Sequence, residues 1–124
     1  MSPPRPLSPH LQVYRLPLTG LVSISHRITG LFLSLGLLLC VYLLLAIALG
    51  PVSYQAMQTL MATWMGKLVF WGFAYALFFH LCHGVRHLLW DVGKTYDKAS
   101  LTGYAILEVV LSVLLTLMTW FLLS

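Results

Sequence analysis

Ionisable side chains recur along one otherwise apolar segment of this chain, between His80 and Asp91. On a helix of 3.6 residues per turn a narrow stripe is formed by His80, Gly84, His87 and Asp91, with His83 about 60° to one side. Ionisable groups inside a hydrophobic span are costly and rare, so each is a functional candidate. A histidine beside a glycine, which leaves room for a flat group, suits an axially ligated haem. The stripe favours a haem ligand at His80, and a hydrogen-bonded histidine or a proton relay is the alternative.

The depth of His80 in the expected helix supports a special role. With Asp91 at the membrane edge, His80 lies eleven residues deeper, on the order of 16 Å at 1.5 Å per residue. That distance is about half of a ~30 Å hydrocarbon core. Because an unpaired polar group there costs several kcal/mol, His80 needs a partner near the middle of the membrane.

A second polar face lies at the start of the first expected helix. Small and polar residues follow helical spacing at Ser23, His26, Arg27, Gly30 and Ser34. Ser23 and Arg27 share one side, as a hydroxyl and a guanidinium would to hold a carbonyl or a carboxylate. An arginine by itself would be an ordinary membrane-interface anchor. The pair therefore indicates a ligand contact at the same membrane level as the far end of the histidine stripe.

The composition defines the elements that must carry these residues. Of the 124 residues 60% are hydrophobic and 8% are charged, which excludes a soluble globule, a disordered tail and, despite a net charge of +4, a nucleic-acid binder. The sequence has three apolar runs, at residues 31–49, 68–90 and 105–123. Each run is long enough to cross a membrane as a helix. The fold class is an all-α membrane protein with three transmembrane helices. We expect one domain at 1–124, with an extended arm at 1–20 and helices at about 21–49, 66–91 and 103–123.

Basic residues near the helix ends predict the orientation, because cytoplasmic loops carry more Lys and Arg. Only Lys67 lies between the first two helices. The other six flank the first helix or the second loop: Arg5, Arg15, Arg27, Arg86, Lys94 and Lys98. The N-terminus and the second loop are therefore expected in the cytoplasm, and the C-terminus on the opposite side.

Three other side chains are given structural roles. Glu108 lies near the expected start of the third helix, where the helix dipole favours a carboxylate. Cys40 and Cys82 lie in apolar stretches, where a free cysteine behaves as a small hydrophobe. We expect neither a disulfide nor a metal site at the two cysteines.

Three segments together resemble the cytochrome b556 membrane-anchor family of succinate dehydrogenase, respiratory complex II. Residues 5–11 resemble the family's N-terminal arm, and residues 23–30 match its S-x-x-H-R-x-[ST]-G signature. Residues 80–91 match its H-x-x-x-G-x-R-H-x-x-x-D signature. The resemblance covers nearly the whole chain. One departure is His83, where the family commonly has an apolar or amide residue, but the family pattern and the stripe both favour His80 as the iron ligand.

The resemblance implies the site residues. It makes His80 an axial ligand of the haem b iron. The surroundings of the haem and its propionates are then formed by His26, Arg27, Gly84 and His87. The ubiquinone site is then lined by Ser23, Arg27 and Asp91. No residue of the chain is expected to act on succinate itself.

The same resemblance implies the partners. Histidines on one helix cannot reach both faces of a porphyrin, so the other ligand must come from another chain, which the family supplies as a second, smaller anchor subunit. An iron–sulfur subunit, a flavoprotein subunit and the lipid membrane complete the set.

The implied function is that of a membrane-anchor subunit of succinate:ubiquinone oxidoreductase. It contributes a quinone site to electron transport in the tricarboxylic acid cycle. The expected location is the bacterial inner membrane, or the mitochondrial inner membrane in a eukaryote. The alternatives are a quinol:fumarate reductase anchor and a small histidine-based proton relay or transport protein.

Overall fold

The computed structural model describes residues 15–94 and 97–123, and this part of the chain contains helices and short connections without strands. The helices are α1 (Leu18–Ala48), α2 (Pro51–Ala62), α3 (Trp64–Asp91) and α4 (Lys98–Leu123). α1, α3 and the part of α4 from Ser100 onward are long and apolar enough to span a membrane. The prediction of an all-α membrane protein with three transmembrane helices is confirmed.

The first connection differs from the sequence expectation, which placed a loop between the first two spans. α2 has 12 residues, too few to cross a bilayer, and it links α1 to α3. Gly50 makes the turn into α2 with a φ of 99°, a left-handed conformation that favours glycine. Pro51 then occupies the first helical turn, where its missing N–H leaves no hydrogen bond broken. α2 was not predicted because its sequence lacks a long apolar run.

All three spanning helices begin earlier than expected, α3 only slightly, at Trp64 instead of about 66. α1 begins at Leu18 directly after the extended Pro17, so it includes residues that were assigned to the N-terminal arm. Most of that arm, residues 1–14, lies outside the described residues. α4 begins at Lys98 rather than at about 103, since Asp97 accepts a hydrogen bond from the Ser100 amide at 2.9 Å. Hydrogen bonds from Ser100 lower the pKa of this exposed Asp97 carboxyl.

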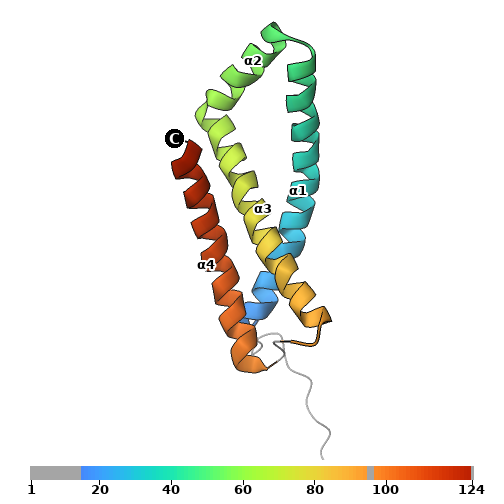
Figure 1. The fold of residues 1–124 in the computed structure, drawn as a ribbon, viewed down its shortest axis with the longest axis vertical. Coiled ribbons are helices and arrows are strands. Elements are labelled where there is room, and N and C mark those ends of the chain that lie inside the picture. Colours follow the sequence, from blue (N-terminus) through green and yellow to red (C-terminus); the bar gives the residue numbers. More distant parts are fainter. Residues whose placement is uncertain (1–14, 95–96, 124) are drawn as a thin grey trace, which may run out of the picture.

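α3 is the central helix of the arrangement. It packs against both α1 and α4, while α2 connects the C-terminal end of α1 to the N-terminal end of α3 (Figure 1). The start of α1, the end of α3 and the start of α4 meet at one end of the molecule, and α4 ends at the other (Figure 1). Near the first end a small core joins the three spans through Val22, Phe79, Ala105 and Val109. This core fixes the rotation of the helices beside the polar residues.

The contact between α1 and α3 depends on close approach at Gly36. A Cβ on Gly36 would lie 2.7 Å from Cε1 of Phe73, so only glycine lets the two helices come this near. Phe73 also stacks on Phe32 of α1, with ring centroids 4.2 Å apart. Small residues allow such packing between transmembrane helices, where apolar burial alone gives no preference for protein over lipid. The crossing brings the N-terminal half of α1 against the polar half of α3.

The arrangement gives a prediction for membrane topology. Arg15, Arg27 and Lys94 belong to the end where α1 begins and α3 ends, whereas Lys67 belongs to the α2 end. Alkaline phosphatase, which is active only outside the cytoplasm, should be inactive when fused after Lys94 and active when fused after Leu123. Fluorescent-protein fusions at the same positions should give the opposite pattern. Equal phosphatase activity of both fusions would contradict the count of three spans.

Candidate functional site

His26 of α1 lies against three histidines of α3. Its ring stacks on His80 with centroids 4.0 Å apart and an angle of 19° between planes. The centroid of His26 is 4.4 Å from that of His83 and 5.7 Å from that of His87. We call these four residues the histidine cluster. The stripe on α3 was visible in the sequence, but the central place of His26 required the helix crossing.

The histidine cluster contains nitrogen atoms that are ready to bind a ligand. His83 is fully buried, His87 is exposed, and His26 and His80 are partly buried. Nε2 of His26 and Nε2 of His83 are buried and have no hydrogen-bond partner within residues 15–94 and 97–123. Ligating nitrogens of His26, His83 and His87 lie within 4.8 Å of one another, close enough for one metal ion after small adjustments. Buried polar atoms without a partner are rare, so they point to a missing ligand or ion.

The surroundings of His80 fit a haem group. Its Nδ1 lies 3.3 Å from the hydroxyl of Thr29, which leaves Nε2 as the nitrogen available for iron. One turn further along α3, a Cβ built on Gly84 would meet no heavy atom within 4 Å. The space beside Gly84 is therefore open to a flat group. The haem roles that the sequence implied for His80 and Gly84 stay predictions.

A buried ion-pair network joins α3 to α4. Nδ1 of His83 lies 3.1 Å from both carboxylate oxygens of Glu108, and Nη1 of Arg86 donates to Oε1 of Glu108 at 2.9 Å. Nη2 of Arg86 donates to the carbonyl oxygen of Leu101 at 3.1 Å. The three side chains of His83, Arg86 and Glu108 are almost completely shielded from solvent. We call them the buried triad.

The buried triad corrects two sequence predictions. Glu108 was expected to be stabilised by the helix dipole, but α4 begins ten residues earlier, at Lys98, so this carboxylate is outside the first turn. Arg86 was counted among the basic residues at the membrane edge, yet only 3% of it is exposed. The signal was available in the sequence as a lone acidic residue in an apolar run. Such a residue requires a cation, but the run does not say which one.

The residues predicted to contact quinone lie at the end of the molecule where α1 begins and α3 ends: Ser23, Arg27 and Asp91. Ser23 is half-buried, and Arg27 and Asp91 are exposed. Arg27 and Asp91 form no ion pair with any residue that the structure describes. Within residues 15–94 and 97–123, these two charged groups at a membrane edge therefore have no ion-pair partner.

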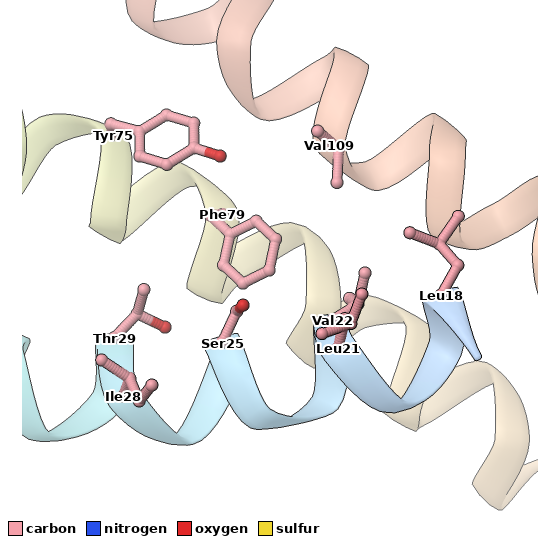
Figure 2. Close-up of a pocket in the computed structure, with 9 residues that line it drawn as sticks. All are labelled: Leu18, Leu21, Val22, Ser25, Ile28, Thr29, Tyr75, Phe79 and Val109. Carbon is pink, nitrogen blue, oxygen red and sulfur yellow. The ribbon is translucent and has the colours of Figure 1, made fainter. Parts of the chain in front are cut away.

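A cavity of about 420 Å³ opens nearby among α1, α3 and α4 (Figure 2). Its lining is mostly apolar, with hydroxyls from Ser25, Thr29 and Tyr75 (Figure 2). The predicted quinone contacts Ser23 and Arg27 do not line this cavity. Ser25 and Ser23 are two positions apart on a helix, so their side chains leave it in directions about 200° apart.

The fold and the site define a class, a polytopic α-helical membrane protein with a histidine cluster between two of its spans. A family model described as succinate dehydrogenase/fumarate reductase transmembrane subunit matches residues 1–121. The chain belongs to this family. The resemblance found in its sequence motifs is thereby confirmed.

Relatives in bacteria and mitochondria support the same assignment. The chain is 40% identical over 121 residues to a succinate dehydrogenase cytochrome b556 subunit of Paracoccus denitrificans, covering 94% of this chain and 92% of that protein. It is 36% identical over 123 residues to a cytochrome b560 subunit of Reclinomonas americana, covering 94% and 84%. A mitochondrial cytochrome b560 subunit of Sus scrofa is 35% identical over 115 residues, covering 89% and 66%. The expected location, a multi-pass protein of an inner membrane, agrees with these relatives and with the three spans.

Proposed function

We propose that this chain is the haem- and quinone-binding membrane anchor of a succinate:ubiquinone oxidoreductase. The observation that carries the proposal is the histidine cluster: Nε2 of His26 and Nε2 of His83 are buried without a partner in the part of the chain that the structure describes, and the backbone at Gly84, one turn from His80, has open space beside it. Relatives named cytochrome b556 and cytochrome b560 subunits support haem b as the group that belongs there. The chain has no part in the oxidation of succinate itself.

In this proposal His80 donates Nε2 to the haem b iron. His26, Arg27 and His87 would hold the propionates, whose negative charge suits an arginine and imidazole N–H donors. Haem b supplies a carrier for single electrons when bound. The other histidines of α3 share its helix and the His26 ring is stacked on His80, so none of them faces His80 across a haem, and a second iron ligand would come from a smaller anchor subunit. The exposed faces of the spans leave ample apolar surface for such a partner.

Ser23 and Arg27 form the quinone contact of the chain, with Asp91 at the same membrane edge. A quinone carbonyl that accepts electrons gains negative charge on its oxygen, and donors already held at that oxygen stabilise the charge. The guanidinium of Arg27 offers several N–H donors, and Ser23 is one turn away on the same side of α1. Electrons reach this end of the membrane from an iron–sulfur subunit, which receives them from a flavoprotein subunit.

Removing either donor tests the quinone assignment. In membranes that contain Ser23→Ala or Arg27→Leu, succinate-dependent ubiquinone reduction should be slower. The activation free energy of this reaction should rise by on the order of 2–4 kcal/mol. Reduction of an artificial dye by succinate should persist, because the dye takes electrons before they reach this chain. Both activities are measured on the same membranes, normalised to flavin content.

Ser25→Ala is the matched control, since Ser25 is an exposed serine of the same helix turn that points into the cavity and away from Ser23. It should leave both activities at the wild-type level. Wild-type quinone reduction in Ser23→Ala and Arg27→Leu would contradict the quinone site. Equal loss of dye reduction would instead indicate that the soluble subunits no longer dock.

A further inference from the structure

Which atom donates in the hydrogen bond between Thr29 and His80 is determined by a second hydrogen bond of the Thr29 hydroxyl. The Thr29 hydroxyl donates its proton to the carbonyl oxygen of His26, one turn earlier in α1, at 2.9 Å. The same oxygen lies 3.3 Å from Nδ1 of His80. Because its single proton is already used, the Thr29 oxygen accepts at this second contact, and Nδ1 of His80 must be the donor. A neutral imidazole with its proton on Nδ1 has its lone pair on Nε2.

Two further contacts from the same turn of α1 hold the His80 ring. A Cβ on Gly30 would lie 3.1 Å from Cε1 and 3.7 Å from Nδ1 of His80, so the backbone of α1 comes up to this edge of the ring. The ring of His26 covers one ring face at a centroid distance of 4.0 Å. The edge and one face of the ring are therefore in contact with α1, and Thr29 provides the hydrogen bond among these contacts.

We propose that Thr29 is a positioning residue for haem ligation, which keeps His80 in the tautomer and orientation that present Nε2 to iron. The inference rests on the proposed function, since it requires His80 to be the ligand. A hydrogen bond to the far nitrogen of a ligating histidine fixes its tautomer and makes the ligating nitrogen more basic. A more basic ligand favours the ferric over the ferrous state, so the Thr29 contact lowers the reduction potential of the haem.

The experiment compares Thr29→Val, which has nearly the same shape but no hydroxyl, with Thr29→Ser, which keeps the hydroxyl. Each variant is purified as the assembled complex, and the haem is titrated against redox potential by its absorption. Thr29→Val should raise the midpoint potential and lower haem affinity by about 10- to 100-fold, the usual cost of losing such a hydrogen bond. Thr29→Ser should keep both close to wild type. Thr29→Ala repeats the measurement if the valine variant fails to assemble.

Two results would overturn the role of Thr29. One is a wild-type potential and haem content in the variants without a hydroxyl, and the other is a shift of the same size in Thr29→Ser. A His80→Leu complex measured in parallel separates this inference from the proposed function. If it loses haem while Thr29→Val behaves as wild type, only the role of Thr29 fails. If it keeps haem, the assignment of His80 itself fails.

Discussion

Replacing His80 with leucine is expected to abolish the low-spin haem b spectrum of the assembled complex. Leucine fills a similar volume but offers no nitrogen to iron, and a ligand from the partner subunit alone leaves one axial position empty. The reduced-minus-oxidised spectrum and the haem-to-flavin ratio of the purified complex measure the effect. Dye reduction by succinate should remain, because the dye takes electrons from the soluble subunits before they reach this chain.

His83→Asn is the matched control, on the same helix and three residues away. Nδ1 of His83 is bonded to Glu108, and the asparagine amide can donate to the same carboxylate. The variant therefore removes the unpartnered Nε2 of His83 while it preserves the contact to α4. Most of the haem should remain. Loss of the haem bands in His83→Asn together with their retention in His80→Leu would reverse the ligand assignment.

Replacing Glu108 with leucine is expected to destabilise the chain by about 3–5 kcal/mol, the usual cost of breaking a buried ion pair from one side. Arg86, of which only 3% is exposed, would keep its bond to the Leu101 carbonyl but lose its carboxylate partner. His83 would lose its carboxylate partner at the same time. The thermal midpoint of the purified complex, followed by loss of the haem band, should fall accordingly.

A triple variant shows whether this loss comes from the unpaired charge or from changed packing. With Glu108→Leu, Arg86→Met and His83→Leu combined, no buried ionisable group remains in the triad. Apolar replacements of similar volume often match or exceed the stability of a buried ion-pair network. The triple variant should therefore recover most of the midpoint. A Glu108→Leu complex as stable as wild type would show that the triad has no stabilising role.

Much of the candidate site could be predicted from the sequence because it depends on spacing within one helix. His80 and Gly84 are one turn apart in any α-helix, so their stripe follows from residue numbers alone. The approach of α1 to His80 could not be derived in this way. Thr29 is separated from His80 by 51 positions, and their contact depends on the glycines that let the two helices cross closely.

The sequence by itself determined the membrane location and the three spans, because a run of about 20 apolar residues crosses a bilayer whatever its neighbours are. Only the tertiary structure decided the partner of each polar side chain. Glu108 needed a cation, but the choice of Arg86 and His83 depends on how α3 and α4 are rotated about their axes. That rotation is set by the contacts of Phe79, Val22 and Ala105, which belong to three different helices. A pattern along one helix cannot specify it, because packing between helices in lipid depends on the shapes of both surfaces.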